Sequence, residues 1–432
     1  GDRPRKLLKR GAVTAAAAAT LAWIQPAPAA DGIPVANLVD FTGRTATVGK
    51  PYGQAKVDAV KWLNAKGGIN GKPIDLSTFD YSYEVPRAIN TYKQWKQEGV
   101  VAIQGWGTAD TEALVSFVGA DEIPFFSASY SAHLTDPTGK GPAGSKAAPY
   151  NFIMGPSYSD SVRALIAWAK EDWQRKGGKG QPKYVHMGDN HPYPNAPKKA
   201  GEEYAKEQGF TVLPSIQYTL APGDFKAQCL TLKESGANYA FLANTSGANI
   251  SLLKSCETVG VDVQFLSNIW GYDENVMKAA GKAADGVVWV MGSAPWGADV
   301  PGIKLVHEIA KNADPAVTYQ LPHYIRGVCS FYFMKEAMEW ADKNGGITGP
   351  NIKKGMYQKK DWVPAGLEGV CPKGNWTAED HRGFTQVLLY QGKVKADAPA
   401  DADIAKLIAD GTIGMAQVFA IDIERKPEWL GW

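Results

Sequence analysis

The sequence predicts an α/β protein of two doubly wound, Rossmann-like lobes. From residue 34 onward, short apolar segments of strand length alternate with segments whose apolar residues recur at helical spacing. This alternation is typical of parallel sheets that helices cover on both faces. It continues for roughly 400 residues, which is more than one doubly wound domain usually contains. With 432 residues, of which 44% are hydrophobic, the chain is long enough for two hydrophobic cores.

The first half of the chain shows several such elements. An apolar face that includes Ala55, Ala59 and Leu63 predicts a helix that ends before the pair Gly67-Gly68. Further helices are expected at 85–97, 111–118 and 161–173, and strands at 35–41, 74–80, 100–104 and 124–127.

The second half continues the alternation. Strands are expected at 184–187, 211–213, 239–243, 263–266 and 286–290, with helices between them. Two more helices are predicted at 303–311 and 324–342, followed by a strand at 384–390 and a polar stretch near 396–403.

The first thirty residues have the pattern of an export signal. Basic residues between Arg3 and Arg10 precede an apolar, alanine-rich run over 12–24, and Ala27-Pro28-Ala29 offers small residues for cleavage. The run is shorter than the ~20 apolar residues that a membrane span needs. We therefore expect a signal peptide at 1–30 and a periplasmic protein. The net charge of +2 gives no reason to expect a nucleic-acid partner.

The four cysteines are candidates for disulfides. They form no CxxC pair, which disfavours a zinc or thioredoxin-like site. Exported chains can form disulfides, and four cysteines allow three pairings. We favour Cys229 with Cys256, because they lie on consecutive predicted helices of one α/β unit, and then Cys329 with Cys371. The alternative for Cys329 is a thiol in the core, since it shares a helical face with Phe333.

The corner between the first helix and the second strand has a specific sequence. Residues 64–72 read Asn-Ala-Lys-Gly-Gly-Ile-Asn-Gly-Lys, and a strand that ends at Asp80 follows. This corner resembles the branched-chain amino-acid binding proteins, which are periplasmic solute-binding proteins of ABC importers. Residues 378–383, Ala-Glu-Asp-His-Arg-Gly, and 428–431, Glu-Trp-Leu-Gly, resemble segments of the same family.

The resemblance implies a topology and a function. Two lobes would be joined by three hinge crossings near 150–156, 290–296 and 378–386. The implied function is to bind a small molecule between the lobes and to deliver it, by hinge closure, to the permease of an ABC importer in the inner membrane. We expect a monomer without cofactor or catalytic activity. The expected parts are the signal peptide at 1–30, lobe 1 at 31–152 and 294–378, lobe 2 at 153–293, and the third crossing with the rest of lobe 2 at 379–432.

Ligands of doubly wound sheets bind beyond the carboxyl ends of the strands. Helix N-termini there offer free N–H groups and a positive dipole end. In lobe 1 the resemblance implies that the loop 104–110 holds the ligand through backbone N–H groups and the Thr108 hydroxyl. Trp106 is expected either to stack on a planar ligand or to pack between the lobes. The candidate ligand-binding residues of lobe 1 are Trp106, Thr108, Ala109, Ser127, Ala128, Ser129 and Tyr130.

In lobe 2 the resemblance points to Tyr193, Thr245 and Trp270, with Tyr193 at the position of an aromatic that covers the ligand. Two positions depart from the amino-acid binders. Ala248 stands where they carry the Glu that neutralises the α-ammonium, and Tyr130 stands where they tend to have Thr. Because a buried unpaired charge is unfavourable, we expect an aromatic or other small carboxylate, or an amide, rather than an aliphatic amino acid.

Other functions have weaker support in the sequence. Residues 105–110 form a broken dinucleotide fingerprint, with Asp110 where the third glycine belongs. His186, Asp189 and His191 lie at a predicted strand end and offer either a metal site or hydrogen-bonded cleft histidines. A periplasmic enzyme of α/β fold is therefore the weaker alternative. A receptor that reports its ligand to a membrane sensor stays open as well, because it would use the same lobe closure.

Overall fold

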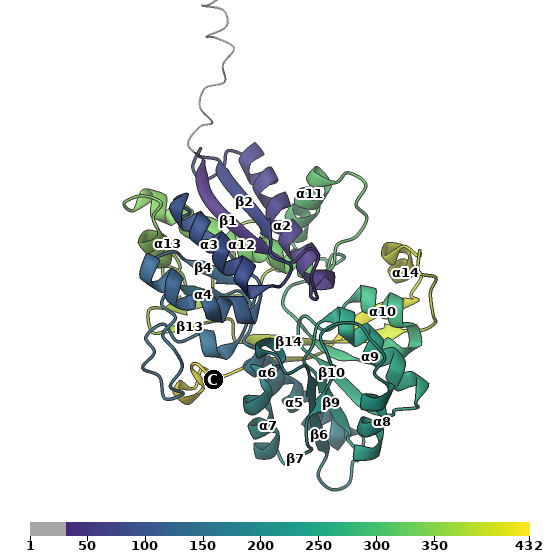
Figure 1. Ribbon diagram of the computed structural model, residues 1–432. Helices are drawn as coiled ribbons and strands as arrows, with labels where there is room; N and C mark the ends of the chain where they lie inside the picture. Colours follow the sequence, from purple (N-terminus) through teal and green to yellow (C-terminus); the bar gives the residue numbers. More distant parts are fainter. Residues whose placement is uncertain (1–31) are drawn as a thin grey trace, which may run out of the picture.

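Two lobes, each built on its own sheet, make up the molecule (Figure 1). The structure, a computed structural model, describes residues 32–432. The predicted signal peptide at 1–30 lies outside the described residues. Within 32–432, no helix combines the length and the apolar character that crossing a membrane requires. The predicted fold class, two doubly wound lobes, is confirmed.

Lobe 1 contains a parallel sheet of five strands in the order β2-β1-β3-β4-β5. Its strands are β1 (Ile33–Val39), β2 (Ile74–Asp80), β3 (Ala102–Gln104), β4 (Phe125–Ser127) and β5 (Asn151–Ile153). Its helices are α2 (Ala46–Ala65), α3 (Val85–Gln97), α4 (Thr108–Asp121), α11 (Ile303–Ala313), α12 (Pro322–Lys343) and α13 (Gly349–Gly355). Helix α12 packs against α2 and α13. Because α12 is enclosed in this way, it is buried on almost all sides from Pro322 to Met334.

Lobe 2 contains the larger sheet, in the order β15-β14-β11-β10-β9-β6-β7, with β8 also paired to β6. Its strands are β6 (Lys183–Gly188), β7 (Thr211–Val212), β8 (Ile216–Gln217), β9 (Tyr239–Leu242), β10 (Gln264–Ser267), β11 (Val288–Met291), β14 (Gln386–Val394) and β15 (Ile413–Asp422). Its helices are α5 (Tyr158–Arg175), α6 (Pro192–Asn195), α7 (Lys198–Glu207), α8 (Lys226–Ser235), α9 (Ser246–Thr258), α10 (Glu274–Ala280) and α14 (Ile404–Ala409). The strands from β6 to β11 are parallel, and β14 and β15 are antiparallel to their neighbours.

The corner at 64–80 folds as the sequence predicts. Helix α2 ends at Ala65, and Gly68 takes a left-handed conformation, with φ of +66°. A Cβ added at Gly68 would lie 2.1 Å from the carbonyl oxygen of Lys72, so only glycine fits this turn. Ile69 and Lys72 exchange backbone hydrogen bonds of 2.7 and 3.0 Å, and β2 follows.

The C-terminal strands differ most from the prediction. Strand β14 extends to Val394, beyond the expected end at 390, and β15 was not predicted. β15 is an edge strand with both faces partly exposed, so it lacks the clear alternation of apolar and polar residues that identifies a half-buried strand. Its pairing with β14 is a long-range contact that local sequence does not encode.

The motif at 378–383 lies beside the first passage between the lobes. In β13 (Asp380–Gly383), the His381 ring bonds the carbonyl oxygen of Asn151 through Nδ1 at 2.7 Å and the Tyr357 hydroxyl through Nε2 at 2.5 Å. The next residue after this strand, Phe384, pairs with Pro156. These contacts join the segment at 151–156 to the segment at 381–384, and we retain the lobe boundaries given above as a proposal.

Both predicted disulfides are present. Cys229 on α8 is bonded to Cys256 on α9, and Cys329 on α12 is bonded to Cys371 in the segment that precedes β12 (Asn375–Thr377). The pairing expected from the sequence is therefore confirmed. The first bridge fixes two helices of lobe 2 to each other, and the second ties the core helix of lobe 1 to a long surface segment.

Removing the first bridge should destabilise the protein. The double variant Cys229→Ala with Cys256→Ala opens a cross-link between residues 27 apart. Chain-entropy arguments give such a bridge about 3 to 4 kcal/mol, so the midpoint of urea unfolding should fall clearly below that of the wild type. As a control, wild-type protein unfolded without reductant should show no reactive thiol. Four reactive thiols, or an unchanged midpoint, would contradict the assignment.

Candidate functional site

A small cavity lies where the strand ends of the two lobes meet. Its free volume is about 20 Å³, enough for a single water molecule. Lobe 1 and lobe 2 both contribute to its wall. The lining residues are Thr45, Tyr83, Trp106, Gly107, Thr108, Ala128, Tyr158, Tyr193, Thr245 and Trp270.

The lining side chains come from the carboxyl ends of parallel strands, as expected for doubly wound sheets. In lobe 1 they follow β1, β2, β3 and β4, and in lobe 2 most of them follow β6, β9 and β10. Six predicted residues belong to this wall, and the other four lie close behind it or beside it. The six are Trp106, Thr108, Ala128, Tyr193, Thr245 and Trp270.

Hydroxyl groups support the lobe 1 wall from behind. The Thr108 hydroxyl shares a hydrogen bond of 2.6 Å with the Ser129 hydroxyl. Ser127 is also buried behind the wall, where its hydroxyl accepts a hydrogen bond of 2.9 Å from the backbone N–H of Ser129. Ala109 lies in the first turn of α4 and is half-buried, and Tyr130 is fully buried beside Trp270. Ala109, Ser127, Ser129 and Tyr130 thus surround the wall rather than line the cavity.

A buried carboxylate orients Trp106. Asp40 accepts a hydrogen bond of 2.6 Å from the Thr45 hydroxyl, and Thr45 in turn accepts one of 2.8 Å from the Trp106 indole N–H. Both Asp40 and Thr45 are buried, so the indole is held in one orientation. Trp106 packs against Trp270 of the other lobe, which is one of the two roles expected for it. It also lines the cavity, and its stacking on a planar ligand stays a prediction.

Asp110 caps the helix that begins at the cavity. Its carboxylate accepts hydrogen bonds from the backbone N–H of Gly107, at 3.0 Å, and from the Tyr81 hydroxyl, at 2.8 Å. Burial raises the pKa of Asp110 to about 6, although these hydrogen bonds act in the opposite direction. The side chain is therefore engaged within lobe 1 and does not face the cavity wall.

Asn268 orients the lobe 2 wall. Its side-chain oxygen accepts hydrogen bonds from the Tyr193 hydroxyl, at 2.9 Å, and from the backbone N–H of Trp270, at 2.7 Å. Thr245 directly precedes α9, and its buried hydroxyl has no hydrogen-bond partner among residues 32–432. This hydroxyl is therefore free to contact a ligand.

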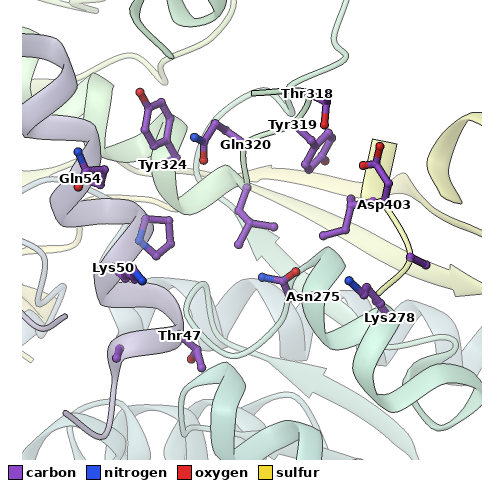
Figure 2. A pocket seen from close by; sticks show the side chains of 15 residues that line it. Thr47, Lys50, Gln54, Asn275, Lys278, Thr318, Tyr319, Gln320, Tyr324 and Asp403 are labelled. Carbon is purple, nitrogen blue, oxygen red and sulfur yellow. The ribbon is translucent and has the colours of Figure 1, made fainter. Parts of the chain in front are cut away.

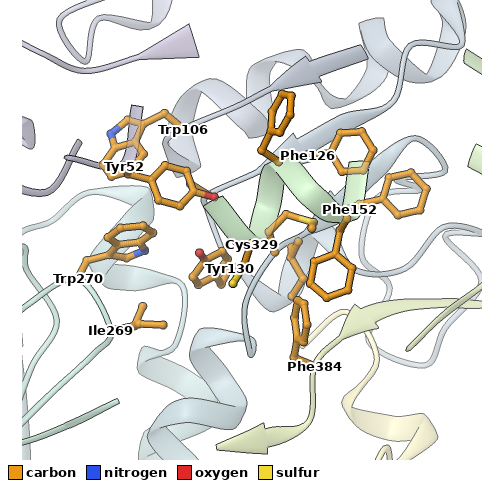
Figure 3. Close-up of a cluster of buried hydrophobic side chains, with 14 of the residues drawn as sticks. Tyr52, Trp106, Phe126, Tyr130, Phe152, Ile269, Trp270, Cys329 and Phe384 are labelled. Carbon is orange, nitrogen blue, oxygen red and sulfur yellow. The ribbon is translucent and has the colours of Figure 1, made fainter. Parts of the chain in front are cut away.

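Trp270 is the main contact between the lobes at this site. Its ring lies 4.9 Å from Trp106, 5.2 Å from Tyr52 and 5.6 Å from Tyr130, measured between ring centroids (Figure 3). All three partners belong to lobe 1, and Trp270 is only 2% exposed. The indole from lobe 2 therefore fills space between aromatic side chains of lobe 1, which explains the small cavity.

A buried polar relay lies on the other side of the indole. The Arg326 guanidinium is 4.3 Å from the centre of the Trp270 ring, and its Nη2 donates to Nδ1 of His323. The other ring nitrogen of His323, Nε2, is 2.9 Å from the Asp273 carboxylate. Burial lowers the pKa of His323 to about 4, so at neutral pH the ring is neutral and donates from Nε2 to Asp273. Hydrogen bonds thus connect Arg326 and His323 of lobe 1 to Asp273 of lobe 2.

Two further polar contacts close the interface. The Thr47 hydroxyl at the start of α2 shares a hydrogen bond of 2.8 Å with Ser246 at the start of α9. The Tyr319 hydroxyl bonds the Glu274 carboxyl group. Burial raises the pKa of Glu274 to about 8, so this carboxyl group is largely protonated at neutral pH. The observed conformation is therefore a closed one.

Residues 32–399 match the sequence profile of the periplasmic binding proteins. The chain belongs to the periplasmic binding protein family. Among curated proteins, the leucine-, isoleucine-, valine-, threonine- and alanine-binding protein of Pseudomonas aeruginosa is 21% identical over 299 residues, which are 68% of this chain and 76% of that protein. The resemblance found in the sequence is therefore confirmed.

Solved structures of this family share the fold. A branched-chain amino acid ABC transporter protein from Thermus thermophilus with bound valine superposes with a TM-score of 0.74 and 20% identity, over 88% of this chain and 100% of that one. A fatty acid ABC transporter substrate-binding protein from Thermomonospora curvata gives a TM-score of 0.75 and 18% identity, over 91% and 93% of the two chains.

Ala248 has a different place in this periplasmic binding protein from the one the sequence suggested. It is fully buried on α9 and packs in the core of lobe 2, so it does not line the cavity. Asp189 accepts a hydrogen bond from the backbone N–H of Leu220 at 3.0 Å. No lining residue of the cavity carries a carboxylate. The cavity wall as a whole therefore offers no carboxylate to an ammonium group, whichever residue stands at position 248.

The two cleft histidines have structural contacts. The His191 ring accepts a hydrogen bond from the backbone N–H of Tyr193 at 3.1 Å, and it stacks on Tyr83 of lobe 1 at 5.4 Å. His186 is buried in β6 against Phe241. Within 32–432, no group of three or more His, Cys, Asp or Glu side chains is arranged to hold a metal ion.

Sequence reasoning missed several residues of the site. Thr45, Tyr83 and Tyr158 line the cavity but were not predicted, whereas Gly107 belongs to the predicted loop 104–110. Tyr83 and Tyr158 follow β2 and β5, so the rule of strand ends would have found them. Arg326 gave no comparable signal, because it lies in the middle of an apolar helical pattern.

A larger groove lies farther along the interface. Its volume is about 530 Å³, and it is lined by polar side chains from both lobes (Figure 2). Thr47, Lys50 and Gln54 of α2 stand across from Asn275 and Lys278 of α10 (Figure 2). Because Thr47 also bonds Ser246, this groove borders the closed contact, and separation of the lobes would widen it. Unlike the smaller cavity, this groove is not surrounded by the carboxyl ends of strands from both sheets.

Replacement of Trp270 by alanine should shift the unliganded protein toward an open form. The change removes three aromatic contacts between the lobes, each worth about 0.5 to 1.5 kcal/mol. Small-angle X-ray scattering should therefore show a larger radius of gyration for Trp270→Ala than for the wild type. Trp62→Ala is the control, since Trp62 does not line the cavity and its ring lies 4.5 Å from Lys66, the residue that follows α2. Equal scattering from Trp270→Ala and the wild type would contradict this role.

Proposed function

We propose that this protein is the extracytoplasmic solute-binding component of an ABC importer, and that its ligand is an aromatic or other small carboxylate, or an amide. The observation that carries the proposal is the wall of the cavity between the lobes. This wall is largely aromatic, and no carboxylate lines it. An α-ammonium group placed there would be buried without a partner, which is strongly unfavourable.

The relatives support a range of ligands. The similar proteins named above are described as binding branched-chain and small amino acids, and one is a fatty acid transporter protein. The scaffold is therefore compatible with ligands that have a carboxylate and no ammonium. In our proposal Tyr193, Trp270 and Trp106 enclose the body of the ligand, and the wall around Thr108 and Ala128 receives its polar end.

Ligand entry requires movement of the lobes. The cavity of about 20 Å³ cannot hold a molecule larger than water. We propose that the lobes open about the three crossings, admit the ligand and close on it, and that the permease recognises the closed form. A monomer suffices for this cycle, and it needs neither a cofactor nor a chemical step. A membrane sensor would use the same motion, so uptake of bound ligand by membranes that carry the cognate permease distinguishes the two functions.

Matched pairs of ligands test the absence of an ammonium site. 4-Methylpentanoate has the skeleton of leucine without the amine, and 3-phenylpropanoate stands in the same relation to phenylalanine. An unpaired buried charge costs about 3 to 5 kcal/mol, so each amino acid should bind roughly two to four decades more weakly than its deaminated partner. A ligand that binds the native state raises the melting temperature, so a thermal-shift panel ranks the four compounds.

The panel also has outcomes that contradict the proposal. A large shift with leucine and none with 4-methylpentanoate would show that the site provides a partner for the ammonium. The absence of any shift with carboxylates, amides and amino acids alike would contradict the proposed ligand class.

A further inference from the structure

Arg326 is a buried cation whose hydrogen-bonding capacity is largely unused. Its side chain is 2% exposed. Nη2 donates to His323, but Nε and Nη1 have no hydrogen-bond partner among residues 32–432. Arginine is charged at any physiological pH. Two unmet donors on one buried guanidinium are unusual, because buried charges are normally paired and hydrogen-bonded.

The nearest carboxylate compensates this charge only at a distance. Asp273 bonds His323, and the neutral ring of His323 stands between Asp273 and Arg326. Among the described residues, no Asp or Glu side chain forms a salt bridge with Arg326. The position is therefore one at which a further anion would be stabilised.

Aromatic side chains occupy the space in front of the guanidinium. The face of Trp270 lies 4.3 Å away, and a cation–π contact of this kind is weaker than a charge-assisted hydrogen bond. The hydroxyls of Tyr52 and Tyr130 point toward each other beside Trp270 (Figure 3). Both hydroxyls are buried close to each other, and among residues 32–432 neither has a well-aligned hydrogen-bond partner. The donors of three side chains thus gather around the place that the Trp270 indole now fills.

We propose that Arg326 is the anchor for the carboxylate of the ligand, and that the ligand takes the place of the Trp270 indole. This inference rests on the proposed binding function, sharpens it to an anionic ligand, and moves the polar end of the ligand from the wall around Thr108 and Ala128 to Arg326. The carboxylate accepts hydrogen bonds from the free N–H groups of Arg326 and from the hydroxyls of Tyr52 and Tyr130. Its body lies along Trp106, and Trp270 moves off the guanidinium to cover it.

The charge balance favours a monocarboxylate over other anions. One guanidinium faces the site, and Asp273 already supplies a negative charge through His323. A phosphate with nearly two negative charges would leave an excess of negative charge in a buried place. A primary amide offers only one oxygen acceptor and no charge, so it should bind much more weakly than the matched carboxylate.

The test removes the charge of the ligand and the charge of residue 326 in turn and measures binding in each case. The probes are 3-phenylpropanoate, 4-methylpentanoate and octanoate, each with its primary amide, measured by thermal shift and by titration calorimetry. The variants are Arg326→Gln and Arg326→Lys. Arg44→Gln is the matched control, because Arg44 is an exposed arginine of lobe 1 close to the cavity, 5.6 Å from the Tyr83 ring.

We expect at least one carboxylate to bind the wild type and its amide to bind at least tenfold more weakly. Arg326→Gln should lose about a hundredfold or more in affinity for that carboxylate. Arg326→Lys should recover part of the loss, and Arg44→Gln should bind as the wild type does. The unliganded melting temperature of Arg326→Gln should be equal to or above that of the wild type, since an under-paired buried charge has been removed. A residue with only a structural role would instead lower it.

Three outcomes overturn the inference. If the carboxylate and its amide bind equally, or if Arg326→Gln retains the affinity, Arg326 is not the anchor, while the binding function stands. If Arg326→Gln lowers the unliganded melting temperature and leaves the ligand-induced shift intact, the residue is structural. If none of the six probes binds the wild type, both the carboxylate site and the proposed ligand class are wrong.

Discussion

In the closed form of this protein, one indole and one guanidinium occupy the space in which we propose that the ligand binds. Trp270 extends from lobe 2 and lies on Arg326 of lobe 1, with Tyr52, Tyr130 and Trp106 around it. These groups are buried, so water cannot satisfy the guanidinium, whose contacts are the His323 ring and the face of the indole. The same contact excludes a ligand, because the cavity beside it has a free volume of only about 20 Å³. Closure without ligand and binding of ligand therefore compete for the same space.

This competition sets what a ligand must do. A ligand shifts the balance between open and closed forms only by the difference in its affinity for them. It has to replace the aromatic contacts of Trp270, each worth about 0.5 to 1.5 kcal/mol, and a carboxylate does so with charge-assisted hydrogen bonds that the indole cannot provide. The remaining contacts between the lobes, such as Thr47 with Ser246, are available to any closed form. Trp270 and Arg326 therefore take part both in closure without ligand and in recognition, whereas Thr47 and Ser246 take part in closure alone.

The fold and much of the cavity wall were predictable from the sequence, because local rules determine them. Alternating strands and helices require parallel sheets, and ligands of such sheets lie at the strand ends, where Trp106, Thr108, Tyr193 and Trp270 were expected and are found. Arg326 was not predictable in this way. It is one polar residue within the apolar helix α12, and its role emerges only when Trp270 approaches from a distant part of the chain. For Ala248 the prediction failed in the opposite way. The resemblance placed it at a ligand-contact position, but on α9 the residue faces the core of lobe 2.

The most direct test is a crystal structure of the protein with the carboxylate that binds best. We expect a carboxylate oxygen within hydrogen-bonding distance of the Arg326 guanidinium and of the Tyr52 or Tyr130 hydroxyl. We also expect the Trp270 indole to have left its position over the guanidinium and to cover the body of the ligand. A bound ligand whose carboxylate contacts only the Thr108 loop, with Trp270 still stacked on Arg326, would contradict this proposal.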